Sequence, residues 1–118
     1  MIILPYGNYV ISNQGFERMM KKATTNLRAQ ARLLKALAHE SRLAIVSRLS
    51  SGPTTVGELV SMIGAEQSTV SKHLTVLKAA GIVDDERKGQ TVEYRLVIPC
   101  VLEFLNCATK VIQEQREV

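Results

Sequence analysis

Between residues 67 and 78, polar side chains follow one another with the spacing of a helix face. Gln67, Ser68, Ser71 and Lys72 each offer a hydrogen-bond donor or acceptor at steps of one, three and four residues. A Gln amide pairs with adenine in the major groove of DNA, a Ser hydroxyl donates or accepts there, and Lys suits phosphate. We therefore predict a DNA-reading surface on this helix, made of Gln67, Ser68, Thr69, Ser71, Lys72 and His73.

A second kind of chemistry is available from the only two thiols, Cys100 and Cys107. Seven residues apart on one helix, they share a face but lie about 10.5 Å apart along the axis. A disulfide needs Cβ atoms about 4 Å apart, so a single helix cannot bridge them, whereas Cys100 of one chain can approach Cys107 of a partner chain. Cys100 follows Pro99 at a predicted helix N-terminus, where the dipole favours the thiolate.

Two interpretations of this pair stay open. The cysteines form a sensor for an oxidant, reactive sulfur or arsenite, with an attacking and a resolving thiol. Alternatively, they are small apolar residues suited to a close helix–helix interface. Arsenite would need a third ligand that the sequence does not supply.

Several helices must position these residues. Residues 16–37 contain no Gly or Pro and place apolar side chains at three- and four-residue steps, which predicts an amphipathic helix with basic residues outside. A second helix ends before residues 50–53, and the break between the two lies near His39 or Glu40. Residues 1–15 show no helical period and are interpreted as an N-terminal arm, ahead of one domain over 16–118.

The next two helices have the pattern of a helix-turn-helix. Thr55 and Glu58 have the spacing of a capping box, in which each side chain takes one free backbone N–H of the new helix. This helix ends at Gly64, and a second helix runs from about residue 67 to residue 80, with Val70, Leu74 and Leu77 inward. Gly81 suits the left-handed position of a Schellman cap.

After Gly81 the period changes from 3.6 to 2, and residues 88–90 form the turn of a hairpin. Such a wing carries Arg87, Lys88 and Gln90 toward flanking DNA. Pro99 then begins a last helix. The predicted fold class is mainly α with a small β-hairpin wing (α+β), a winged helix-turn-helix that dimerises through its first and last helices. We expect Val101 and Leu105 at that dimer interface.

Composition narrows the classes of function. A length of 118 residues suits one domain. The net charge is +4, and the positive charge is concentrated in residues 17–48, which contain eight basic and two acidic residues. Such a basic half suits a polyanion, although a merely solvated helix face explains it equally well. No apolar run is long enough to span a membrane, and the N-terminus lacks the basic region of a secretory signal, so we expect a cytoplasmic protein. No phosphate loop or paired carboxylates suggest an enzyme, and a Cys–His nucleophile built from these residues has no pocket to serve.

Three segments, ALAHESRLAIV, STVSKHLTVLKAAGIV and KGQTVEYRL, together resemble the ArsR/SmtB family of winged-helix repressors, over about residues 30–98. The resemblance implies a homodimer that binds palindromic, double-stranded operator DNA and leaves it when an inducer binds. It also implies two metal sites that this chain does not match. The soft-metal site uses Cys-x-Cys where this chain has residues 55–59, without Cys, and the zinc site uses Asp and His on a last helix that here has no His.

We therefore expect no cofactor other than a thiophilic inducer that acts at Cys100 and Cys107. The same two cysteines are the remaining candidates for a metal site. Two alternatives stay open: a winged-helix regulator without thiol sensing, and a winged helix that contacts proteins and never DNA. Loss of binding with added salt would separate the DNA-binding hypotheses from the last one, because phosphate contacts release counterions.

Overall fold

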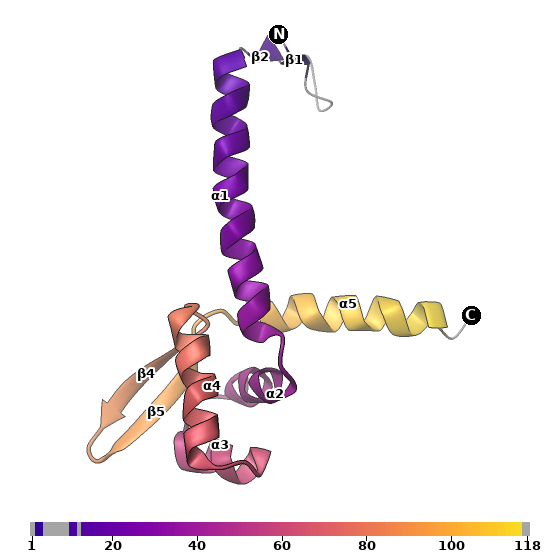
Figure 1. Cartoon of the computed structure of the whole chain (residues 1–118). Coiled ribbons are helices and arrows are strands. Elements are labelled where there is room, and N and C mark those ends of the chain that lie inside the picture. Colours follow the sequence, from indigo (N-terminus) through magenta and orange to yellow (C-terminus); the bar gives the residue numbers. More distant parts are fainter. Residues whose placement is uncertain (1, 4–9, 12, 117–118) are drawn as a thin grey trace. The chain divides into compact units, whose positions relative to one another are not determined.

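The computed structural model describes residues 2–3, 10–11 and 13–116 (Figure 1). The chain divides into two compact units, residues 1–34 and residues 35–118. Among the described helices, none is both long and apolar enough to cross a membrane.

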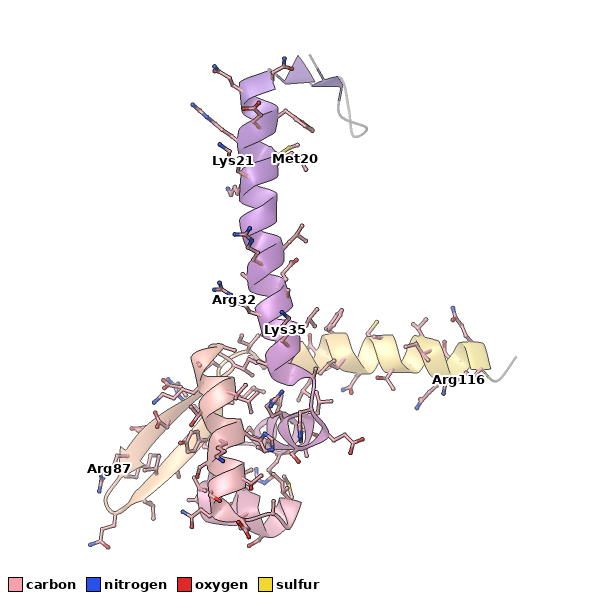
Figure 2. All side chains as sticks on the ribbon, in the orientation of Figure 1. Met20, Lys21, Arg32, Lys35, Arg87 and Arg116 are labelled. Carbon is pink, nitrogen blue, oxygen red and sulfur yellow. The ribbon has the colours of Figure 1, made fainter. Side chains whose placement is uncertain are left out.

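The first unit contains a strand pair and most of the first helix. Strand β1 (Ile2–Ile3) pairs antiparallel with β2 (Val10–Ile11), and helix α1 (Asn13–Leu37) follows. The helix begins three residues earlier than predicted, because Gly15 lies in its first turn, where a glycine does not stop a helix. Residues 1, 4–9 and 12 of the predicted arm lie outside the described residues. Figure 2 shows Lys21 and Arg32 on one side of α1 and Met20 on the other, the amphipathic arrangement that was predicted.

Three helices form the centre of the second unit: α2 (Glu40–Leu49), α3 (Val56–Ile63) and α4 (Gln67–Ala79). The break before α2 lies where the sequence predicted it, and His39 is the N-cap residue. Gly64 ends α3 in the left-handed conformation, with φ 74°, which glycine adopts without steric cost. Both α2 and α3 pack against α4.

The core of this unit is built from one side of each helix and the start of the wing. The predicted inward residues of α4, Val70, Leu74 and Leu77, are each 0% exposed. Burying a side chain of this kind stabilises the fold by about 1.5–3 kcal/mol relative to leaving it in water. The other fully buried large side chains are Ile45, Val46, Leu59, Ile82 and Val83.

The wing belongs to a three-stranded antiparallel sheet with the order β3-β5-β4. Strands β4 (Val83–Lys88) and β5 (Thr91–Leu96) form the predicted hairpin, with Gly89 at φ 66° in its two-residue turn. Strand β3 (Thr54–Thr55) pairs with β5 through Thr54–Tyr94 and Thr55–Glu93. Strand β3 was not predicted, because two residues are too few to show a period of two. The fold class, mainly helical with a small wing, is confirmed.

The last helix, α5 (Cys100–Arg116), begins directly after Pro99. Val101 is only 6% exposed within its own chain, so its predicted place in a dimer interface is wrong: it already belongs to the core. Leu105 is half-buried. The strongly exposed apolar side chains of α5 are Phe104, Val111 and Ile112.

Candidate nucleic-acid interface

Helix α4 is buried along one side only, and its other side carries the predicted base-reading residues. With Val70, Leu74 and Leu77 in the core, the side chains at the start of the helix lie in solvent. We call these five exposed residues the reading face: Gln67, Ser68, Thr69, Ser71 and Lys72. One turn further along, the exposed Thr75 donates its hydroxyl proton to the Ser71 carbonyl over 2.9 Å. Polar groups are thus concentrated at the N-terminal end of α4, the end that helix-turn-helix proteins insert into the major groove.

A Schellman cap at the other end of α4 leads the chain directly into the wing. The Ile82 N–H donates to the Leu77 carbonyl and the Gly81 N–H donates to the Lys78 carbonyl, each over 3.0 Å. Gly81 has φ 79°, so this predicted cap is confirmed. Because β4 starts at Val83, the wing begins two residues after the capping glycine and packs beside α4 (Figure 1).

An ion pair joins α4 to the wing. Lys78 Nζ lies 2.7 Å from Asp85 Oδ1, and this hydrogen bond, together with the charge of Asp85, raises the pKa of Lys78. The neighbouring Asp84 accepts a hydrogen bond from the Asp85 N–H and pairs with Arg95, and both contacts lower the pKa of Asp84. Lys78 therefore stays charged, but its charge is compensated within the protein.

An open groove of about 490 Å³ separates this part of α4 from the wing. Thr75, Lys78, Asp85 and Tyr94 supply its polar groups, and Leu74 and Ala79 complete its lining.

The predicted wing residues lie at the tip of the hairpin. Arg87, Lys88 and Gln90 are exposed, and Figure 2 shows Arg87 near the end of the β4–β5 hairpin. Lys88 Nζ lies 3.2 Å from Glu93 Oε1, and the Arg87 side chain donates to the Gly89 carbonyl over 3.3 Å. The Arg87 contact uses only Nε, so its terminal guanidinium nitrogens stay available to a ligand, and Lys88 keeps further N–H donors beside its contact with Glu93.

His73 is placed apart from the reading face. Its ring is half-buried and lies against the ring of His39, with centroids 4.4 Å apart and planes inclined by 48°. Burial, the nearby His39 and the guanidinium of Arg42 all lower the pKa of His73. Local sequence patterns could not predict this contact, because the two residues stand 34 positions apart.

The start of α3 is held differently from a capping box. Thr55 Oγ1 accepts from the Glu58 N–H over 3.3 Å, which is the predicted first half of the motif. The second half is wrong: the Glu58 carboxylate accepts from the Thr54 hydroxyl and lies 3.5 Å from Arg48. The β-strand pairing of Thr54 and Thr55 with β5 explains the difference, because it places the Thr54 hydroxyl within reach of the carboxylate. Glu58 thus ties α3 to β3 and to the end of α2.

Cys100 and Cys107 are both exposed, free thiols on α5. They stand on one helix at the predicted spacing of two turns. Across the part of the chain that the structure describes, no three His, Cys, Asp or Glu side chains gather closely enough to hold a metal ion.

The basic residues that dominate the net charge belong to another element. Six exposed bases lie on α1: Arg18, Lys21, Lys22, Arg28, Arg32 and Lys35. By contrast, residues 49–83, which contain α3 and α4, hold two bases and two acids. The shape and polarity of α4, more than net charge, mark it as the candidate interface.

Comparison with known proteins gives concordant matches. The profile of the family described as "Bacterial regulatory protein, arsR family" matches residues 39–85. The HTH-type transcriptional repressor SmtB of Mycobacterium tuberculosis is 49% identical over 70 residues, which are 59% of this chain and 52% of SmtB. This chain therefore spans about half the length of that relative.

Solved structures match over more of their length. The transcriptional repressor BigR from Xylella fastidiosa is 37% identical with a TM-score of 0.64, covering 80% of this chain and 93% of BigR. The homodimeric winged helix-turn-helix DNA-binding domain of Mb0332 from Mycobacterium bovis, a possible ArsR-family regulator, is 30% identical. Its TM-score is 0.71, and the match covers 81% of this chain and 89% of that domain.

Proposed function

Because the chain belongs to the arsR family of bacterial regulatory proteins, a family of transcriptional regulators and not of enzymes, we propose that it represses transcription by binding double-stranded operator DNA. The observation that carries this proposal is the one-sided burial of α4. Val70, Leu74 and Leu77 are completely buried, while the reading face offers five polar side chains at the N-terminal end of the same helix.

In the proposed complex, α4 enters the major groove and α3 braces it across the DNA backbone. Gln67 and Ser68 contact base edges, since they stand at the leading end of the helix, and Lys72 contacts phosphate. The wing tip, with Arg87, Lys88 and Gln90, reaches the flanking backbone or minor groove. An operator-binding role also implies a cytoplasmic protein.

We further propose that the protein acts as a homodimer on a palindromic operator. The homodimeric relative supports this arrangement, as do the apolar side chains that the chain leaves exposed on two helices. A two-fold axis places the two copies of α4 about 34 Å apart, which matches one turn of DNA. The exposed apolar residues that a partner would cover are Met19, Met20, Leu27 and Leu34 on α1 and Phe104, Val111 and Ile112 on α5.

The inducer that we propose is thiophilic and acts on Cys100 and Cys107. Both thiols are exposed within the chain and stand on a helix assigned to the dimer interface. A peroxide converts one thiol to a sulfenic acid and releases water, and a thiol of the partner subunit displaces a second water to form a cross-chain disulfide. Such a link lowers DNA affinity only if it favours a dimer geometry that fits the operator less well. Arsenite or reactive sulfur are the other members of this inducer class.

The test is binding to the DNA upstream of the protein's own gene, compared with a shuffled duplex of equal length. Fluorescence anisotropy over a range of salt concentrations is expected to show preference for the native sequence and a steep loss of affinity with salt. Equal binding to both duplexes would contradict operator recognition. No binding at low salt would favour a winged helix that contacts only proteins.

A further inference from the structure

The chain has two histidines, and the fold brings them together. His39 caps α2, His73 lies in the middle of α4, and their ring centroids are 4.4 Å apart. Histidine is the side chain whose ordinary pKa lies closest to physiological pH, so a contact between two of them responds to mild acidification.

His39 performs its capping role only while one ring nitrogen carries no proton. Its Nδ1 accepts the Ser41 N–H over 3.0 Å and so satisfies a free donor in the first turn of α2. Protonation converts Nδ1 into a donor and removes the cap. It also places a positive charge at the positive end of the α2 dipole, which is unfavourable.

His73 faces basic side chains from the element packed against it. On the α2 side these are His39 and Arg42, and Arg42 is held in place because it donates to the backbone carbonyls of Ala36 and Lys35. Glu40, in the first turn of α2, is exposed and does not contribute to the shift of the His73 pKa. On its own helix, the neighbouring Lys72 is also a cation.

We propose that His39 and His73 form a proton-sensitive positioning contact: neutral rings hold α4 against the start of α2, and protonation separates them and lowers affinity for DNA. His73 is not one of the five residues of the reading face, so the contact positions the helix without occupying that face. The DNA part of this inference rests on the proposed function.

The direction of the pH effect follows from the lowered pKa of His73. As pH falls, the unfolded chain takes up the proton first, near the ordinary value of about 6.5, whereas the folded chain resists it. The stability that the neutral pair contributes is therefore complete above about pH 6.5. It is lost as the pH falls from there toward the folded-state pKa.

A direct contact between His73 and DNA would have the opposite signature. An imidazolium at the DNA surface adds a positive charge beside phosphate, so acidification would tighten binding. The sign of the pH dependence therefore separates a positioning residue from a DNA-contacting one.

The experiment measures operator affinity of the full chain between pH 5.5 and 8 at constant ionic strength, for wild type, His39→Asn, His73→Gln and the double variant. Asn is a good N-cap residue without a titrating ring, so His39→Asn keeps an acceptor for Ser41 and removes the switch. Wild type should lose affinity for the operator on acidification, in the direction set by the lowered pKa of His73. The affinity of the variants should change much less over the same pH range. A flat wild-type profile, tighter binding in acid, or a profile unchanged in the double variant would overturn the proposal.

A second measurement does not involve DNA. NMR titration of the imidazole Cε1–H signals should show that the pKa of His73 rises toward 6.5 in His39→Asn, and the acid loss of unfolding free energy should shrink in the same variant. An unmoved His73 pKa would refute the contact even if operator binding were found. If the pKa moves but no DNA binds at any pH, the proposed function fails while the proton-sensitive contact stands.

Discussion

Lys78 Nζ and Asp85 Oδ1 lie 2.7 Å apart, so the last turn of α4 is linked to the first strand of the wing by an ion pair. Both residues belong to the groove between these two elements. An exposed pair of this kind adds little to stability. Its effect is on charge: Asp85 compensates a lysine that stands on the proposed DNA-binding helix.

Asp85→Asn should therefore tighten DNA binding. The substitution leaves the Lys78 ammonium free for a phosphate, so the slope of log affinity against log salt should steepen by about 1. The measurement is a salt series by anisotropy. Glu86→Gln is the matched control, since it removes an exposed acid of the same strand that does not pair with Lys78. An equal gain in both variants would mean that only net charge matters.

Three substitutions on the reading face should separate positioning from sequence reading. Lys72→Gln should weaken binding to every duplex alike and reduce the salt slope by about 1. Ser68→Ala or Gln67→Ala should instead cost about 1–3 kcal/mol against one preferred base and leave shuffled DNA unaffected. Competition against duplexes with single base changes measures this. Unchanged preference in both variants would mean that α4 is not the reading helix.

A charge on the exposed side of α5 should split the proposed dimer. Ile112 is 52% exposed in the single chain, so Ile112→Glu should fold normally but lose both self-association and operator affinity. Sedimentation velocity with a parallel binding assay checks this. Val101→Glu is the informative contrast: Val101 is a core residue, so that variant should unfold. An Ile112→Glu monomer that binds a half-site as tightly as wild type binds the palindrome would contradict the dimer.

The thiol proposal predicts that oxidants, polysulfide or arsenite lower operator affinity, and that Cys100→Ser reduces the response more than Cys107→Ser. Mass mapping after oxidation should find a cross-chain Cys100–Cys107 link. The double Cys→Ser protein is the control: it should bind DNA and keep it in the presence of these agents. If that protein still releases DNA, the cysteines only pack and the inducer acts elsewhere.

Two glycines should respond to alanine in opposite directions, because Gly81 caps α4 in the left-handed conformation whereas Gly57 lies inside α3. Gly81→Ala should lower the free energy of unfolding by about 1–2 kcal/mol, because φ 79° is strained for any residue with a Cβ. Gly57→Ala should raise it by about 0.5–1 kcal/mol, since Gly57 lies inside α3 and an added Cβ meets only Thr55 Oγ1 at 3.9 Å. Urea unfolding measures both, and a stable Gly81→Ala protein would argue against the Schellman cap as a determinant of stability.

Sequence periodicity predicted the elements that bury a continuous stripe. The buried set of α4 and the hairpin after Gly81 follow from local spacing, because each position needs only its neighbours along the chain. The same reasoning placed the break before α2 at His39 and the left-handed glycines at the helix ends. The arrangement of these elements as a winged helix was also supported by the resemblance of the sequence to a known family.

Contacts between distant residues could not be predicted in this way. The His39–His73 ring contact and the Lys78–Asp85 pair depend on how separate elements are oriented. Val101 was assigned to a partner interface because an apolar stripe does not reveal which residues the chain itself covers. The Thr54 hydroxyl displaced the reciprocal half of the capping box because β3 was too short to be recognised.

The pairing of Thr54 and Thr55 with Tyr94 and Glu93 has a consequence for protein engineering. The residue that caps α3 is also a ladder position of the wing, so the helix-turn-helix and the wing share one backbone frame. A wing transplanted from a relative will dock correctly only if it preserves the register of β5 against β3. The DNA sequence specificity can therefore be redesigned by exchanging side chains on α4. Replacing the whole wing, in contrast, should disturb α3.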